Sequence, residues 1–320
     1  MKLSVVSPVY NEKENLQLLY DAVIASVTPL NIEWELLLVD DGSKDGSFAE
    51  LERIQATDPQ HVRVISFRRN FGQTAAIAAG IDYARGEVIV LMDADLQNDP
   101  ADIPMILEKL DEGYDVVSGW RYNRQDAWLT RTLPSHIANA LISWVTGVKL
   151  HDYGCTLKAY RREVITGFRL YGEMHRFIPV YAASVGARIT EVRVNHHPRK
   201  FGRAKYGLER TLKVVLDLFV VKFLSSYANK PIYLFGGFGL GMMTLGGGVL
   251  LFLFIRRLAG ISVLQSPLFA VGIMVFLMGF QSAMMGLIAE LLARTYHESQ
   301  GKPTYTVRTI LQLGDGNTQE

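Results

Sequence analysis

The first 95 residues of the chain alternate between two patterns of hydrophobic and polar positions. Short, nearly continuous apolar runs predict strands over residues 3–10, 34–41, 62–67 and 87–95. The segments between them carry apolar residues at helical spacing. Apolar strands that alternate with helices are typical of a mostly parallel sheet covered on both faces. The pattern therefore predicts an α/β fold.

Two long uncharged runs lie in the C-terminal third. Residues 232–255 and 258–289 contain no charged side chain, and each run exceeds the roughly 20 residues that a helix needs to cross a bilayer. We interpret them as a transmembrane hairpin with helices near 232–256 and 268–291. The alternative, two buried helices of a soluble core, is disfavoured because such helices rarely lack charge for so long.

Glycines recur at regular positions in both runs. Gly237 and Gly241 form a GxxxG pair, and Gly272, Gly279 and Gly286 share one helix face. Small faces let membrane helices approach closely, so the second set favours contact within the hairpin or between subunits.

Charges at the ends of the hairpin predict its orientation. Basic residues outside the hairpin outnumber Arg256 and Arg257 between its helices; they are Lys222, Lys230, Arg294, His297, Lys302 and Arg308. Because cytoplasmic flanks carry the excess of Lys and Arg, we expect the N-terminal part and the C-terminal tail in the cytoplasm. The expected organisation is an α/β domain over residues 1–210, a juxtamembrane amphipathic helix over 211–230, the hairpin over 231–293 and a cytoplasmic tail over 294–320.

Overall composition adds two limits. The chain of 320 residues has a formal net charge of only +1, so no charge bias argues for nucleic acid. Its single cysteine, Cys155, cannot form an internal disulfide, which favours a reducing compartment.

Acidic side chains follow three of the predicted strands. Glu12 follows the first strand, Asp40 and Asp41 end the second, and Asp93 and Asp95 end the fourth. Ligands of such sheets bind beyond the carboxyl ends of the strands, so these acids are expected to meet. They fit Mg²⁺ or Mn²⁺ and sugar hydroxyls, although an Asp-x-Asp pair taken alone can be a solvated turn.

Four motifs in one order carry a resemblance to a known family. VVSPVYNEKENL, LLLVDDGSKDGS, RNFGQTAAIAAGIDYARGEVIVLMDADLQNDP and DYGCTLKAYRR resemble the family 2 glycosyltransferases over about residues 3–210. More narrowly, they resemble the polyisoprenyl-phosphate glycosyltransferases, which include dolichol-phosphate mannose synthase, bactoprenol glucosyl transferase and undecaprenyl-phosphate formamido-arabinose transferase. The resemblance implies a Rossmann-like GT-A domain with amphipathic interface helices, a C-terminal two-helix transmembrane hairpin, a divalent metal and inversion at the sugar.

The resemblance also implies roles for residues on the donor side. The nucleotide-sugar pocket is expected to contain Pro8, Tyr10, Glu12, Asp40, Asp93, Arg199 and Lys205. The metal ligands are expected to be Asp93, Asp95 and Gln97, with Asp93 and Asp95 also counted as catalytic. Tyr10 as a packed aromatic and Gln97 as a helix cap remain alternatives. Asp99 is assigned no role beyond its loop.

On the acceptor side, the resemblance implies that Arg121, Arg131 and Ser135 bind the phosphate of a membrane lipid, and arginine forks match phosphate geometry. Ordinary interfacial arginines are the alternative. Asp152 is the expected catalytic acid near the acceptor, where it orients a substrate or takes a residual proton. Residues 128–145 and 211–227 read as amphipathic stretches suited to the headgroup layer, and for 128–145 a helix packed on the sheet is an equal alternative. Residues 196–207 resemble the basic loop that closes over the diphosphate in this family. They read Gly202-Arg203-Ala204-Lys205-Tyr206 where relatives commonly have Gly-Glu-Ser-Lys-Tyr, so the contacts of this loop with the diphosphate are left open.

The expected reaction is metal-dependent, inverting transfer of glucose from UDP-glucose to undecaprenyl phosphate. Formamido-arabinose and GDP-mannose donors remain alternatives. A processive synthase is rejected because the chain lacks a Gln-x-x-Arg-Trp motif and has two spans, and the intact acids argue against an inactive membrane scaffold. We expect a multi-pass protein of the bacterial inner membrane, assembled as a homo-oligomer, which the bacterial members of the group imply is a tetramer, with no nucleic-acid partner.

Overall fold

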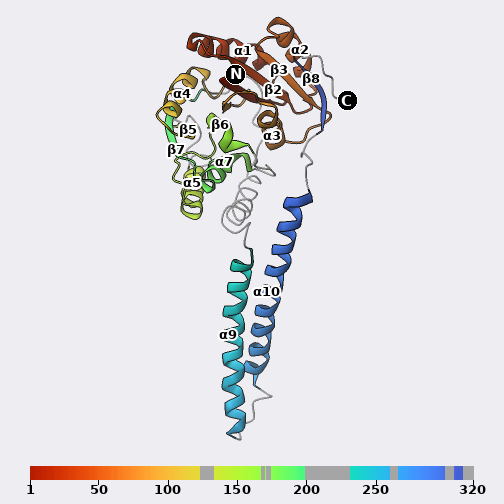
Figure 1. Ribbon diagram of the computed structural model, residues 1–320, viewed down its shortest axis with the longest axis vertical. Helices are drawn as coiled ribbons and strands as arrows, with labels where there is room; N and C mark the ends of the chain where they lie inside the picture. The colour runs from red at the N-terminus through yellow and green to blue at the C-terminus, as the bar shows by residue number, and fades with distance from the viewer. Residues whose placement is uncertain are drawn as a thin grey trace. The chain divides into compact units, whose positions relative to one another are not determined.

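The computed structural model describes the chain in segments (Figure 1). They are residues 1–122, 133–166, 170, 174–198, 231–259, 266–299 and 306–312, with only the backbone described for 133–138, 231–234, 290–291 and 293–299. The chain divides into two units, one formed by residues 1–221 with 303–320 and the other by residues 222–302. Each unit is described by itself.

The first unit is built on a mixed sheet. In its described part the strand order is β7-β5-β6-β4-β1-β2-β3-β8. The strands are β1 Leu3–Val9, β2 Trp34–Asp40, β3 Val62–Phe67, β4 Val88–Leu91, β5 Val116–Arg121, β6 Lys158–Arg161, β7 Ile189–Val194 and β8 Val307–Leu311. The four predicted strands pair in parallel, whereas β6 is antiparallel to both β4 and β5. The mostly parallel α/β sheet predicted from the sequence is therefore confirmed.

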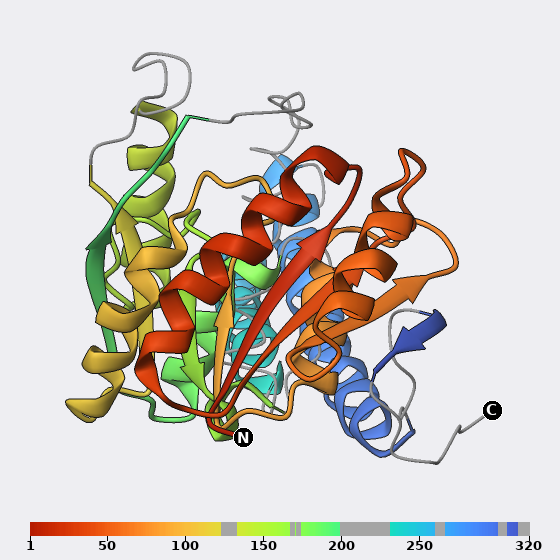
Figure 2. The ribbon, with the colours of Figure 1, turned by 90° about the horizontal axis from the view of Figure 1, so that it is seen from above.

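Helices cover both faces of this sheet, as its apolar strands require. All seven residues of β2 are buried, because Leu36 and Leu38 face one core while Leu37 and Val39 face the other. The first core is closed by α1 Lys13–Val27, α2 Ser47–Thr57 and α4 Ile103–Asp111, of which α1 and α2 cross the front of Figure 2. The second is closed by α3 Gln73–Tyr83, α5 Leu133–Thr146, α6 Arg162–Ile165 and α7 Ile178–Ser184.

A strand at the far end of the chain completes the sheet. The sequence pattern gave residues 294–320 only as a tail, but β8 pairs antiparallel with β3, with Ser66 opposite Thr309. This pairing covers the edge of β3, which would otherwise expose a row of unpaired backbone groups. A strand of five residues is too short for its pattern of apolar and polar positions to distinguish it from a loop.

The second unit is a helical hairpin of α9 Pro231–Leu258 and α10 Pro267–Ser299. The stretches Phe235–Leu258 and Pro267–Ala289 are long and apolar enough to cross a membrane. Only 17% and 11% of their most apolar parts are buried, whereas core helices of a soluble protein are mostly buried. They are therefore candidate membrane spans, as the sequence predicted.

Glycines bring the two helices of the hairpin together. A Cβ atom on Gly239 would lie 2.5 Å from the carbonyl oxygen of Gly279, and one on Gly246 would lie 2.8 Å from that of Gly272. The predicted face of Gly272 and Gly279 thus contacts the other helix. Gly237 and Gly241 point elsewhere, since a Cβ atom on either would meet no described atom within 4 Å.

Candidate active site

Three loops meet at one edge of the sheet. Strand β1 lies between β4 and β2 and is parallel to both, with Val9 opposite Asp40 and Val6 opposite Leu91. The loops that follow these strands therefore leave at their carboxyl ends, where ligands of open α/β sheets bind. The sequence predicted this meeting of acids from the strand pattern alone.

The loop after β1 is tied to the loop after β2. Asn11 takes a left-handed backbone conformation with φ of 51°. Its backbone N–H donates to the Ser43 hydroxyl at 3.0 Å, and its side-chain oxygen accepts from the Lys44 N–H at 2.8 Å. Pro8 and Tyr10 are half-buried. Glu12 is buried at the N-cap of α1, and its carboxylate accepts from the Asn15 side chain in the first turn of that helix at 2.6 Å.

The two aspartates at the end of β2 have different environments. Asp40 accepts hydrogen bonds from the Ser43 N–H at 3.1 Å and from the Ser66 hydroxyl at 3.0 Å. Asp41 accepts from the N–H groups of Phe71 and Gly72 at 2.6 and 2.9 Å. Burial raises the pKa of Asp41 to about 6, against the opposing effect of those two hydrogen bonds. Asp41 therefore anchors the loop that leads into α3.

The Asp-x-Asp motif follows β4 in a strained turn. Leu96 has φ of 61°, a conformation that costs roughly 1–2 kcal/mol for a residue with a side chain. The surroundings hold it: Asp95 accepts from the Gln97 N–H at 3.1 Å, and the Gln97 carbonyl accepts from the His197 N–H at 2.9 Å. Asp95 is buried, while Asp93 and Gln97 are half-buried. Strain of this kind is concentrated at binding and catalytic sites.

These groups fit a hard divalent cation. Across the described residues, no cluster of three or more His, Cys, Asp or Glu side chains could hold a metal by itself. Mg²⁺, however, is usually held by one or two carboxylates and completed by phosphates of the substrate. Asp93, Asp95 and the Gln97 amide after β4 supply oxygen donors of that class.

A bidentate ion pair joins two residues that were predicted from the sequence to serve the acceptor. The Arg121 guanidinium at the end of β5 donates through Nε to Asp152 Oδ2 at 2.7 Å and through Nη2 to Oδ1 at 3.0 Å. Asp152 is 4% exposed and also accepts from the Gly154 N–H at 3.0 Å. A carboxylate engaged this way orients its arginine and is poorly placed to remove a proton from a substrate.

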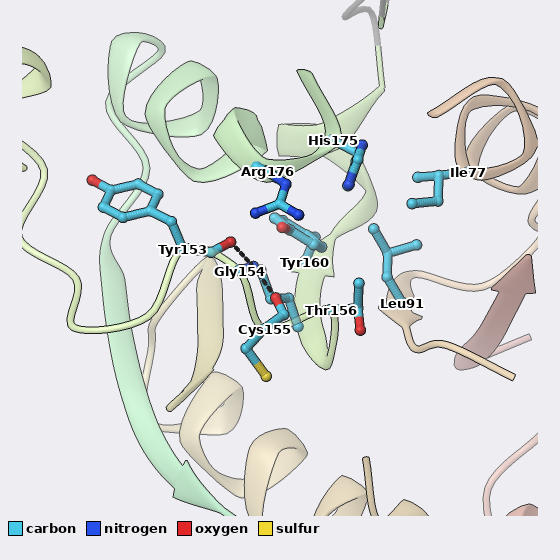
Figure 3. Close-up of a pocket in the computed structure, with 10 residues that line it drawn as sticks. Ile77, Leu91, Tyr153, Gly154, Cys155, Thr156, Tyr160, His175 and Arg176 are labelled. Atoms are coloured by element: carbon cyan, nitrogen blue, oxygen red, sulfur yellow. Dashed lines mark hydrogen bonds between the residues drawn. The ribbon is translucent and has the colours of Figure 1, made fainter. Parts of the chain in front are cut away.

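A small pocket lies beside the loop of residues 152–157 (Figure 3). It is lined by Ile77, Leu91, Tyr153, Gly154, Cys155, Thr156, Lys158, Tyr160, His175 and Arg176. His175 and Arg176 lie on the side opposite Thr156 and Cys155, and the thiol points away from Arg176. Burial raises the pKa of Cys155 to about 11, so this thiol is not a nucleophile at neutral pH.

Lys158 holds the same loop through its backbone carbonyl groups. It is buried at the start of β6 and donates to the carbonyl oxygens of Tyr153, at 3.1 Å, and of Cys155. Burial lowers its pKa to about 8. The ammonium group therefore fixes the backbone of the loop that follows Asp152.

Asp99, to which the sequence assigned no role, links two loops. It caps the short 3₁₀ turn Pro100–Asp102 by accepting from the Ala101 N–H, and it contacts the His197 ring at 3.0 Å. Asp102 likewise accepts from the N–H of Asn195 at 2.7 Å. These acids join the Asp-x-Asp loop to the segment after β7. Their partners lie more than 90 residues away, so no local pattern could have identified them.

Several predicted residues cannot be placed. Arg131, Arg199 and Lys205 lie outside the described residues, and so does the whole 202–206 loop. Ser135 lies in α5, but its side chain is outside the described part. The structure thus places the predicted residues Pro8, Tyr10, Glu12, Asp40, Asp93, Asp95 and Gln97 at the carboxyl ends of three neighbouring strands or in the loops that follow, and separately pairs Arg121 with Asp152.

Comparison with known proteins identifies full-length relatives. The sequence profile described as Glycosyl transferase family 2 matches residues 4–168. Dodecaprenyl-phosphate galacturonate synthase of Rhizobium johnstonii is 44% identical over 314 residues, covering 97% of this chain and 93% of that protein. Undecaprenyl-phosphate 4-deoxy-4-formamido-L-arabinose transferase of Proteus mirabilis is 36% identical over 322 residues, covering 100% and 97%.

The fold also matches solved structures. Glucosyl-3-phosphoglycerate synthase of Mycobacterium tuberculosis, crystallised with Mn²⁺, UDP and glucosyl-3-phosphoglycerate, superposes with a TM-score of 0.50 at 17% identity. The match covers 70% of this chain and 79% of that one. At this identity the likeness shows the shared GT-A fold alone.

Proposed function

This chain belongs to the family 2 glycosyltransferases, in their polyprenyl-phosphate group, and we propose that it transfers one sugar from a UDP-sugar to undecaprenyl phosphate or a close analogue. The observation that carries the proposal is the match over nearly the whole length of two such enzymes, hairpin included. The acids at the strand ends and the Arg121–Asp152 pair support it.

The donor sugar is the finer part of the proposal. The sequence expectation of glucose has no support among these relatives, whose names specify galacturonate and formamido-arabinose. We rank a galacturonate donor first because the more similar relative, at 44% identity, carries that name. Formamido-arabinose follows, then glucose, and GDP-mannose is the remaining alternative.

A divalent cation, Mg²⁺ or Mn²⁺, would be held by Asp95 and Asp93 with Gln97. When bound, it supplies positive charge that stabilises the departing diphosphate. The nucleotide would contact Pro8, Tyr10, Glu12 and Asp40 at the ends of β1 and β2. In this proposal Arg199 and Lys205 add cationic contacts to the diphosphate.

The acceptor requires little help from a base. The second pKa of a phosphate is roughly 6, so the lipid phosphate is mostly ionised at neutral pH. Arg121 binds that phosphate, with Arg131 and Ser135, while Asp152 keeps the Arg121 fork in place. A phosphate oxygen then forms a bond to the sugar C1 as the bond from C1 to the diphosphate breaks on the opposite face. The products are UDP and a polyprenyl-phosphate sugar with an inverted anomeric centre.

The membrane location completes the proposal. The hairpin anchors the chain in the bacterial inner membrane, with the α/β unit and both termini in the cytoplasm, and the chain assembles as a homo-oligomer, a tetramer in this proposal. Cys155 is the single cysteine and is buried, so introduced cysteines can be labelled selectively. We expect a Glu52→Cys thiol to react from the cytoplasmic side of membrane vesicles and a Ser266→Cys thiol from the other side. Crosslinking in the same vesicles reports the number of subunits.

The test is a transfer assay with the full-length protein in detergent. Undecaprenyl phosphate is combined with each labelled nucleotide sugar in turn, with Mg²⁺, with Mn²⁺ or with chelator. We expect one donor to give a labelled lipid only in the presence of metal. Absence of metal-dependent transfer with every donor in the panel would contradict the proposal.

A further inference from the structure

Two residues that lie within the family motifs, and to which no role was assigned from the sequence, hold the first acid of the Asp-x-Asp pair. We propose that Gln73 and Thr156 are positioning residues that fix the Asp93 carboxylate, and that Thr156 connects it to the acceptor-side loop. This inference rests on the proposed function, because it assigns residues to the same site. Neither residue was selected by the sequence analysis.

Each oxygen of Asp93 accepts one short hydrogen bond. The Gln73 side-chain amide, at the start of α3, donates to Oδ1 at 2.7 Å. The Thr156 hydroxyl, two residues before β6, donates to Oδ2 at 2.7 Å. The carboxylate is therefore fixed in rotation by two separate elements.

The direction of the Thr156 hydrogen bond is set by its other partner. The Asn98 amide nitrogen lies 2.9 Å from the same hydroxyl oxygen and can only donate. A hydroxyl has one proton, so that proton is directed to Asp93. The contact of the other amide atom agrees with this assignment, because the Asn98 oxygen accepts from the Cys155 thiol at 3.7 Å. The chain of donors thus ends on the Asp93 carboxylate.

Both donors are neutral, and this leaves Asp93 able to bind a ligand. An ionised carboxylate offers about four lone-pair sites, of which these contacts use two. The remaining sites can accept a ribose hydroxyl or contact a cation. Neutral donors also leave the negative charge of the carboxylate uncancelled, whereas a guanidinium partner would compete with a metal ion.

Thr156 lies on the same short loop as Asp152. Asp152 holds Arg121 on the acceptor side, and Thr156 holds Asp93 on the donor side, four residues later. Lys158 fixes the carbonyl groups of Tyr153 and Cys155 between them. This loop therefore keeps the donor-side acid and the acceptor-side arginine in one rigid frame.

The experiment measures binding of UDP in the presence of MnCl₂ by calorimetry on the full chain in detergent. Thr156→Val keeps the shape of the side chain and removes the hydroxyl, and Thr156→Ser keeps the hydroxyl. A lost hydrogen bond to a charged group predicts a rise in the dissociation constant of about ten- to a hundredfold for Thr156→Val. Thr156→Ser is expected to stay close to the wild type.

Gln73→Leu provides an independent variant, with the same expected direction. Thr57→Val is the matched control, because the Thr57 hydroxyl is exposed and contacts only the Arg53 carbonyl in its own helix. In the transfer assay, Thr156→Val should lower kcat/KM for the donor. A thermal unfolding midpoint for each variant checks that the loop change has not unfolded the protein.

Unchanged UDP binding in Thr156→Val and Gln73→Leu would overturn the inference. Equal losses in Thr156→Ser and Thr156→Val would also overturn it, because they would indicate packing rather than the hydroxyl. The binding measurement does not depend on turnover. A wild type that binds UDP with Mn²⁺ but transfers no sugar would therefore contradict the proposed function while still testing Thr156.

Discussion

Strand β2 carries a buried acid near each end, and the two acids are held differently. Glu35, near its amino end, contacts the Arg63 guanidinium at 2.8 Å, the Ser4 hydroxyl at 2.5 Å and the Arg85 N–H at 2.7 Å. Asp40, at its carboxyl end, accepts from neutral groups of Ser43 and Ser66. The two carboxylates are 1% and 2% exposed, so burial does not distinguish them.

The difference lies in what neutralises the charge. At the amino end the protein supplies its own cation, and the cluster joins β1, β2, β3 and the turn before β4. At the carboxyl end the hydrogen bonds to Asp40 and Asp93 come from neutral donors, so their negative charge is available to a ligand. One end of the sheet therefore neutralises its buried charge within the protein, and the other leaves its charge available, as the proposed binding role requires.

The largest effect is expected from breaking the amino-end pair. Glu35→Gln leaves the Arg63 charge buried without its carboxylate, which costs about 3–5 kcal/mol of unfolding free energy. Urea unfolding followed by tryptophan fluorescence measures this loss. Glu87→Gln, which removes the exposed ion pair with Lys2, is the control and should change stability by less than ~0.5 kcal/mol. A stable Glu35→Gln protein would remove this side of the comparison.

Asp93→Asn tests the carboxyl end. We expect transfer to fall by about 10²–10³-fold, because one of the carboxylates proposed to hold the cation that stabilises the departing diphosphate is lost. The thermal unfolding midpoint should stay close to that of the wild type. The assay measures kcat and KM for the donor at saturating metal. A variant that loses stability but retains transfer per folded molecule would place Asp93 with Glu35, as a structural acid.

Asp152→Asn tests whether a carboxylate with a cationic partner, Arg121, contributes to substrate binding. Loss of the bidentate contact with Arg121 should raise KM for the lipid phosphate about tenfold. The pH profile should keep the shape of the wild-type profile, because Asp152 orients Arg121. Disappearance of the acid limb would instead assign Asp152 as a base. Full turnover with unchanged KM would exclude both roles.

The smallest effect is expected for Asp41, as a dependence of the stability of the fold on pH. Its pKa is about 6 when folded and roughly 3.9 when unfolded, so the folded state binds more protons between these values. The contribution of Asp41 to stability is thus present at pH 4 and is lost as the pH rises through 6. Relative to Asp41→Asn, the wild-type midpoint should fall by a few degrees between pH 4.5 and 7.5. A constant difference across this range would contradict the raised pKa.

The comparison also separates what the sequence predicts from what it does not. The parallel strands and the meeting of Asp40, Asp93 and Asp95 follow from apolar runs that end in acids, because strand period and topology rules are local and general. The family was recognisable for the same reason, since three of its four motifs include these strand ends.

Contacts between distant segments were not predictable. Thr156 lies 63 residues from Asp93, and Arg63 lies 28 from Glu35, so neither pairing leaves a trace in the local pattern. Strand β8 reaches β3 from the other end of the chain, and the antiparallel β6 interrupts the parallel order. Each of these features depends on tertiary packing, about which the local sequence pattern carries no information.

We propose above all that the acids at the carboxyl end of the sheet catalyse sugar transfer to a polyprenyl phosphate. The most direct test of this proposal is mass spectrometry of the lipid product from wild type, Asp93→Asn and Glu35→Gln, incubated in parallel with undecaprenyl phosphate, metal and the donor panel. We predict a polyprenyl-phosphate sugar from the wild type and, per folded molecule, from Glu35→Gln, with almost none from Asp93→Asn. Equal product from Asp93→Asn, or none from the wild type with any donor, would contradict the account.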